Sequence, residues 1–175
     1  IGADGEGKVI EGFELGVVFG WEISQLPPLG TLASLGVTRL SAAGSFSKKG
    51  KISDISSIDT LKGLKSLSFS NCNSLSDIKA LSKLNQLETL DLSDCKALTD
   101  ISGPAQLKKL QALDLSGCEK LTKLSEIAGM KSLQSLDLSK CARLSDLAGL
   151  SKLKRLQHLN LSNCGALAKI SELSG

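Results

Sequence analysis

Five cysteines recur in this chain at a constant interval of 23 residues, at Cys72, Cys95, Cys118, Cys141 and Cys164. A fixed period of this length indicates stacked structural repeats, in which each repeat contacts only its neighbours. The chain has 175 residues, and fainter copies of the pattern continue upstream of Cys72. We therefore expect a solenoid of about seven coils.

Alignment on the cysteines gives the pattern L-x-x-L-x-x-L-x-L-S-x-C-x-x-L-x-x-I/L, as in the segments 90–95 and 113–118. The alternating L-x-L segment is typical of a strand with one buried face. After the cysteine the apolar residues lie three apart, as in Leu75, Ile78 and Leu81. That spacing favours 3-10 turns or extended arcs over an α-helix, in which intervals of three and four alternate.

The repeat pattern resembles the leucine-rich repeat family, in the form that has cysteine where asparagine is more usual, and the resemblance covers residues 61–175. It implies an α/β leucine-rich-repeat solenoid with a parallel β-sheet on a concave face and short 3-10 or irregular arms on the convex face. The short arms are similar to those of bacterial internalins and of a eukaryotic phosphatase regulatory subunit. Those proteins have asparagine in the ladder and a unit one residue shorter, so their partners do not transfer to this chain. The L-D-L-S-x-C-x-x-L phrase is more similar to plant intracellular immune receptors, F-box proteins and trypanosomatid repeat proteins.

The regularity of the pattern predicts three parts. Residues 1–12 are expected to complete an N-terminal cap, residues 13–60 to form two irregular coils, and residues 61–175 to form five regular coils. Terminal repeats are often atypical because they cover the end of the core. Since the sequence stops in the middle of a repeat, we expect a truncation at the C-terminus.

The cysteines are expected to lie where each strand ends, packed as small apolar residues with a weak S–H donor aimed at backbone carbonyls. Neighbouring rungs of a parallel sheet are about 4.8 Å apart, which is within disulfide range. Stacked side chains project in parallel, however, and five is an odd number, so we expect free thiols. Free thiols favour an intracellular, reducing compartment. Close pairs such as C-x-x-C, which hold zinc, are missing from the ladder, and neither a metal nor a cofactor is expected.

The residues that point away from the core along the strands are the candidate binding site. Stacked carboxylates repel one another unless a group compensates them. They could form an acidic stripe for a basic peptide or a cation, or they could be solvated consensus residues of the repeat. The residues expected to bind a partner are Ser68, Thr89, Asp91, Asp114, Ser135, Asp137, His158 and Asn160, and Asp94, Lys140 and Asn163 could add contacts at the edge.

Enzymatic chemistry is not expected from these residues. His158 is the single histidine, and a His–Ser pair would need a third partner and an oxyanion site. Equivalent aspartates on an open sheet do not have the unlike environments that separate an acid from a base. A glycine-rich phosphate loop in a strand-to-helix context is also missing.

Composition limits the partners. The chain has 21 basic and 18 acidic residues, a net charge of +3, and only 3% aromatic residues. Lysines in the return arms suggest a phosphate-binding surface, but the scarcity of arginine and of aromatic residues favours a solvated face, and nucleic acid is not expected. No apolar run is long enough for a membrane span.

These observations favour a non-enzymatic protein–protein interaction module that binds a partner on the concave sheet face. The alternative is a structural or sensing segment of a larger signalling protein, of a ubiquitin-ligase-type protein or of a large assembly.

Overall fold

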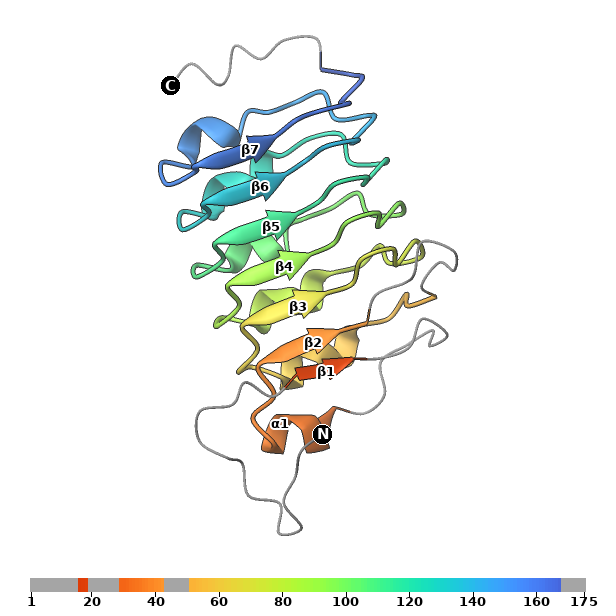
Figure 1. Ribbon diagram of the computed structural model, residues 1–175, viewed down its shortest axis with the longest axis vertical. Helices are drawn as coiled ribbons and strands as arrows, with labels where there is room; N and C mark the ends of the chain where they lie inside the picture. Colours follow the sequence, from red (N-terminus) through yellow and green to blue (C-terminus); the bar gives the residue numbers. More distant parts are fainter. Residues whose placement is uncertain (1–15, 19–28, 43–50, 168–175) are drawn as a thin grey trace.

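The computed structural model describes residues 16–18, 29–42 and 51–167, and in this part of the chain seven parallel strands follow one another in sequence order. Figure 1 shows them as a single open sheet that climbs from β1 to β7. This arrangement confirms the predicted parallel solenoid. The strands are β1 (Gly16–Val18), β2 (Arg39–Ser41), β3 (Ser66–Ser68), β4 (Thr89–Asp91), β5 (Ala112–Asp114), β6 (Ser135–Asp137) and β7 (His158–Asn160).

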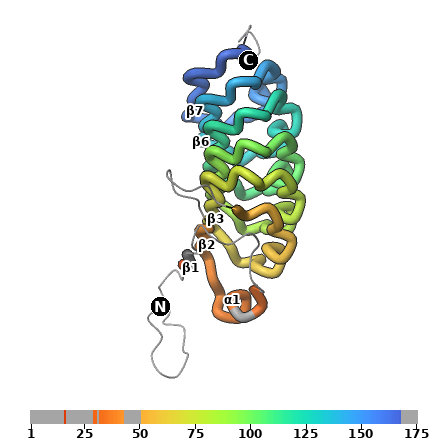
Figure 2. Tube along the Cα trace, turned by 90° about the vertical axis from the view of Figure 1, so that its right-hand side faces the viewer, coloured from red at the N-terminus to blue at the C-terminus, as the bar shows by residue number. Residues whose placement is uncertain are grey.

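Short helical arms return the chain from one strand to the next on the side opposite the sheet (Figure 2). Five of them are 3-10 segments, as the three-residue apolar spacing predicts. They are η1 (Ser56–Thr60), η2 (Lys79–Lys83), η3 (Pro104–Gln106), η4 (Ser125–Gly129) and η5 (Leu150–Lys152).

The first arm differs from the others because it contains a short α-helix, α1 (Gly30–Ser34). The amide of Ala33 donates to the carbonyl of Leu29 at 2.9 Å, which is an α-helical bond. Gly36 follows with φ +66°, the left-handed conformation that commonly ends a helix. The predicted 3-10 conformation is therefore found in the arms from η1 onward but not in the first arm.

The 23-residue period places equivalent residues of successive coils directly side by side. Leu67 pairs with Leu90, Leu90 with Leu113, and the same register continues through Leu136 to Leu159. A shift of one residue would turn every leucine to the solvent side, so the alternating pattern fixes this register.

The core is a continuous stack of leucine and isoleucine between the sheet and the arms. Leu92, Leu115 and Leu138 have no exposed surface, and neither do the arm residues Leu81 and Ile127. Phe69, also fully buried, is the largest side chain among the most buried core residues. A core of aliphatic side chains is what the low aromatic content predicts.

The cysteines form a second ladder at the end of the strands. Each Sγ donates to a backbone carbonyl in the preceding coil, which confirms the predicted S–H donors. All five thiols are free, four are buried and Cys164 is partly buried. The bonds are Cys72 to Ala42 (3.2 Å), Cys95 to Phe69 (3.2 Å), Cys118 to Leu92 (3.3 Å), Cys141 to Leu115 (3.2 Å) and Cys164 to Leu138 (3.0 Å).

The residue before each cysteine has a left-handed backbone. In the first four of these residues the amide reaches across to the next coil, as when Asp94 donates to the carbonyl of Ser116 at 2.6 Å. Asn, Asp and Gly adopt this conformation most readily, and four of the five positions have one of them. Three of these residues, Asp94, Lys140 and Asn163, were expected from the sequence only as edge contacts. The positions are Asn71 (φ 59°), Asp94 (φ 55°), Gly117 (φ 69°), Lys140 (φ 60°) and Asn163 (φ 61°).

The expected N-terminal cap, residues 1–12, and the end of the chain, residues 168–175, lie outside the described residues. The division into irregular coils over 13–60 and regular coils over 61–175 stays a prediction.

Candidate functional site

The outward-facing side of the sheet, here called the sheet face, contains all eight residues that the sequence analysis selected. The leucine at the centre of each strand is buried in β2 to β6, and the residues on both sides of it face outward, as Thr89 and Asp91 do around Leu90. The strand register arranges them in two columns. One column is Ser66, Thr89, Ala112, Ser135 and His158, and the other is Ser68, Asp91, Asp114, Asp137 and Asn160.

The acidic residues of the second column have a structural role as well as a charge. The Oδ1 atom of each aspartate accepts a hydrogen bond from the amide two residues later. The distances are 2.9 Å for Asp91, 2.8 Å for Asp114 and 2.8 Å for Asp137. Asn160 forms the same bond to Ser162 at 3.1 Å through its amide oxygen. These side chains therefore help to end the strand and to begin the turn, a role that the sequence analysis did not consider.

Neutral donors close the acidic column at both ends. The Ser68 hydroxyl donates to Oδ2 of Asp91 at 2.9 Å, and the Asn160 amide donates to Oδ2 of Asp137 at 2.9 Å. No side chain from a neighbouring coil donates to Asp114 within the described residues. The middle carboxylate consequently has a charged neighbour on both sides and lacks the compensation that the outer two receive.

The pKa values follow this difference. Burial raises the pKa of Asp114, and the charges of Asp91 and Asp137 raise it further, although hydrogen bonds from Ser116 act in the opposite direction. Burial also acts upward on Asp137, but hydrogen bonds from Ser139 and Asn160 outweigh it and lower that pKa. A cation placed beside Asp114 would therefore favour its charged form.

The column that begins with Ser66 has short side chains except for His158, and all of them are exposed or partly buried. Thr89 and His158 are exposed, while Ser135 is partly buried. His158 and Ser135 are paired in the register, yet no side-chain hydrogen bond joins them in the part of the chain that the structure describes. The sheet face is therefore a broad surface rather than a cavity.

A second acidic column, which the sequence analysis missed, lies where each arm begins. Its carboxylates also accept the amide two residues later, at distances of 2.7–3.0 Å. The sequence signal is a Ser/Thr-Asp-Ile/Leu phrase at the repeat interval, in which Lys123 replaces the aspartate once. The column is Asp54, Asp77, Asp100 and Asp146, and the donors are Ser56, Lys79, Ser102 and Ala148.

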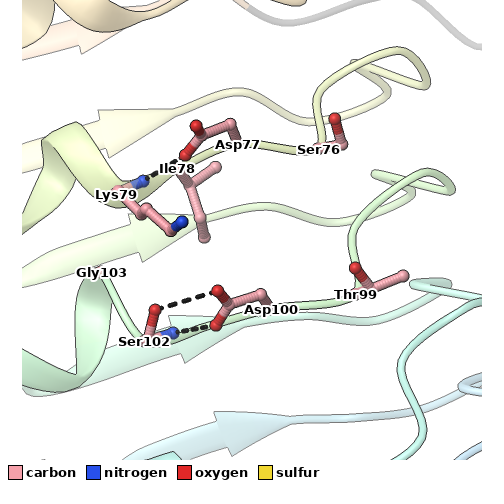
Figure 3. A pocket seen from close by; sticks show the side chains of 8 residues that line it. All are labelled: Ser76, Asp77, Ile78, Lys79, Thr99, Asp100, Ser102 and Gly103. Atoms are coloured by element: carbon pink, nitrogen blue, oxygen red, sulfur yellow. Dashed lines mark hydrogen bonds between the residues drawn. The ribbon is translucent and has the colours of Figure 1, made fainter.

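A hollow of about 250 Å³ separates Asp77 from Asp100 in this column. Figure 3 shows that both carboxylates turn toward their own arm, where Asp77 accepts the Lys79 amide and Asp100 accepts the amide and hydroxyl of Ser102. These bonds lower the pKa of Asp100, and the nearby Lys79 and Lys123 add to the effect. The carboxylates thus stabilise the arms, and the described residues contain no group of three or more His, Cys, Asp or Glu that could hold a metal ion.

The stacked coils, the leucine core and the open sheet face define a leucine-rich-repeat solenoid. The family model of the BspA-type leucine-rich repeat region matches residues 42–168 in six copies, and the chain belongs to that family. Leucine-rich repeat domains generally mediate protein–protein interactions and are generally non-enzymatic.

One solved structure agrees with this assignment. Internalin C2 from Listeria monocytogenes is 25% identical, with a TM-score of 0.64 over 86% of this chain and 63% of the internalin chain. This chain therefore spans less than two thirds of that internalin. The leucine-rich repeat domain of the type III effector XopL is 16% identical, with a TM-score of 0.45 over 84% of this chain and 67% of the effector chain. No curated protein sequence matches the chain.

Among the described residues, the helices are all too short or too polar to cross a bilayer.

Proposed function

We propose that this chain is a non-enzymatic interaction module that binds a protein partner on the sheet face, with the aspartates of the central column as its main contacts. The observation that carries the proposal is the arrangement of Asp91, Asp114 and Asp137, in which the middle carboxylate lacks a compensating neighbour. Small side chains beside the column leave it accessible. The interaction role of leucine-rich repeat domains in general supports the same conclusion.

The partner that fits this column presents lysine or arginine side chains. A cation beside Asp114 relieves the repulsion from Asp91 and Asp137, and electrostatic attraction also speeds association. In the alternative, in which the chain is a structural or sensing segment of a larger signalling or ubiquitin-ligase-type protein, the same column contacts a basic surface of that protein or assembly.

The test replaces the three carboxylates by amides, in the combined variant Asp91→Asn, Asp114→Asn and Asp137→Asn. Alanine would remove the acceptor of the turn amide, whereas Asn160 shows that an amide oxygen keeps this bond. We expect proteins retained by the wild-type chain in an affinity purification to be lost from this variant. Their measured affinity should fall by about tenfold or more, as for the loss of several complementary charges.

The matched control is the combined variant Asp54→Asn, Asp77→Asn and Asp100→Asn, which removes the same charge from the column at the arms. The control should retain the same proteins with an affinity within about twofold of the wild type, because its carboxylates lie at the arms and not on the sheet face, and salt screens distant surface charges. Equal retention by all three baits would refute a role for the sheet-face aspartates.

We also propose that the protein works in a reducing compartment, and the five free cysteines support this. Burial raises the pKa of Cys141 to about 12, so its reactive thiolate is rare near neutral pH. After purification without reductant and denaturation, a thiol reagent should detect all five thiols, and in the folded protein only the partly buried Cys164 should react quickly. A total below five in the denatured protein would contradict the proposal.

A further inference from the structure

One edge of the solenoid, where the chain enters each strand, is strongly basic. In Figure 1 this edge lies at the tails of the strand arrows. Its cations come from three successive coils, at the two central positions of the last turn before each strand. All five are exposed. We call this surface the basic edge, and its residues are Lys108, Lys109, Lys131, Lys154 and Arg155.

These cations are not neutralised by the rest of the described structure. None of the five forms an ion pair there, and the pair between Lys96 and Glu119 lies elsewhere on the coils. Lys109 donates to the amide oxygen of Gln86 at 2.6 Å, a neutral partner from the preceding coil. Glu88 is close to Lys109 and is the acidic exception beside the edge.

The basic edge is hollowed rather than flat. One hollow of about 160 Å³ is lined at one end by Glu88, and its other lining residues are Lys109, Gln111, Ser132, Gln134 and Arg155. A second hollow of about 410 Å³ contacts Gln134 and Arg155 again and adds Lys154 and Gln157. The two hollows therefore adjoin and together form a shallow trough across three coils.

A column of amides lies along this trough. Gln111, Gln134 and Gln157 are held one rung apart, since the backbone amides of Gln134 and Gln157 each donate to the carbonyl of the preceding glutamine at 2.8 Å. The amide of Gln111 donates in the same way to the carbonyl of Glu88. No hydrogen bond within the described chain uses their side chains. Each carboxamide can both donate and accept, so the column suits a ligand that also does both.

We propose that the basic edge binds an anionic polysaccharide, which lies along the trough with its sulfate or carboxylate groups on the cations and its hydroxyls on the glutamines. A nucleic acid fits less well, because the backbone phosphates only accept hydrogen bonds and the described residues of the trough include no aromatic ring for base stacking. The aspartate column of the sheet face lies three residues further along each strand than the glutamines and has the opposite charge.

The defining measurement is the affinity for heparin oligosaccharide, measured by calorimetry at low and at moderate salt. The basic-edge variant combines Lys108→Gln, Lys131→Gln, Lys154→Gln and Arg155→Gln. We expect the wild type to bind with a salt-dependent affinity and the variant to bind at least about tenfold more weakly. An alginate oligosaccharide has carboxylates but no sulfates, whereas heparin has both, so the comparison shows whether binding requires sulfate.

A control variant loses the same charge from exposed residues away from the trough. It combines Lys51→Gln, Lys120→Gln, Lys123→Gln and Arg143→Gln. Its affinity should stay within about threefold of the wild type, because long-range charge is screened by salt. Equal weakening of both variants, or no binding of either oligosaccharide at low salt, would overturn the proposal.

Substitution of the glutamines gives a second test, in which the net charge of the protein does not change. Gln134→Ala with Gln157→Ala should weaken heparin binding several-fold and leave the binding of inorganic polyphosphate, which has no hydroxyls along its chain, unchanged. Tighter binding of single-stranded DNA or of polyglutamate than of heparin and alginate would also overturn the proposal. The sheet-face variant keeps heparin binding in every case, which separates this inference from the proposed partner site.

Discussion

Replacing Phe69 by Ala is expected to lower the free energy of unfolding by about 4 kcal/mol, because it removes a ring from a fully packed position. Phe69 has no exposed surface, and its backbone amide donates to the carbonyl of Asp91 at 2.9 Å. Alanine keeps that backbone bond and the carbonyl that accepts the Cys95 thiol. The loss of unfolding free energy therefore reports side-chain packing between coils. Urea denaturation monitored by circular dichroism measures it.

Phe69→Leu is the matched control. Leu92, Leu115 and Leu138 occupy the equivalent position in the next three coils and are also fully buried. The leucine variant should cost less than about 1.5 kcal/mol, as for a swap that keeps most of the volume. Amide exchange should show the Ala variant losing protection first in β3 and its neighbours, since each coil is stabilised mainly by adjacent coils. Equal losses for the two variants would mean that the ring fills space that leucine cannot.

The sequence predicts the stacked architecture because the period itself has a physical consequence. When a side chain recurs every 23 residues in identical coils, its copies must stack in one column. The leucine column through Leu90 and the thiol bond of Cys95 follow from this rule and from the alternation of the strand. Burial and register of the regular coils could therefore be predicted without any coordinates.

The candidate site is predicted less completely, because its chemistry depends on backbone direction. The sequence shows Asp91, Asp114 and Asp137 as a column of charges. It does not show that one oxygen of each carboxylate is directed back to an amide in its own turn. Asn160 at the same position is the available clue, since Asn and Asp share an acceptor and differ in charge.

The basic edge illustrates a different limit. Lysines are frequent along all the return arms, so Lys109 and Lys154 do not stand out in the sequence. Only the stacking of three coils brings them together with Arg155 around two adjoining hollows. A surface formed by residues of several stacked coils cannot be predicted from the sequence of any single repeat.

Gly149→Ala is expected to destabilise the protein by about 3 kcal/mol, at the upper end of the usual cost of overpacking. A Cβ atom there would lie 2.3 Å from the carbonyl oxygen of Leu124 and 2.5 Å from Cγ2 of Ile127. The Leu124 carbonyl cannot move freely, because it accepts the amide of Ile127 at 3.0 Å in the preceding arm. Gly149 has an ordinary helical φ of −72°, so the position requires a glycine for space and not for conformation.

Gly63→Ala is the matched control, because the nearest atom to its added Cβ is the Val37 carbonyl oxygen at 4.0 Å. This variant should change stability by less than about 0.5 kcal/mol, or raise it slightly by restricting the unfolded chain. Gly103→Ala should behave like Gly149→Ala, since its Cβ would lie 2.3 Å from the Ile78 carbonyl oxygen. Urea denaturation of the three variants measures how closely successive arms must approach. If all three were equally stable, the arms could separate without loss, and the coils would be held together by the sheet alone.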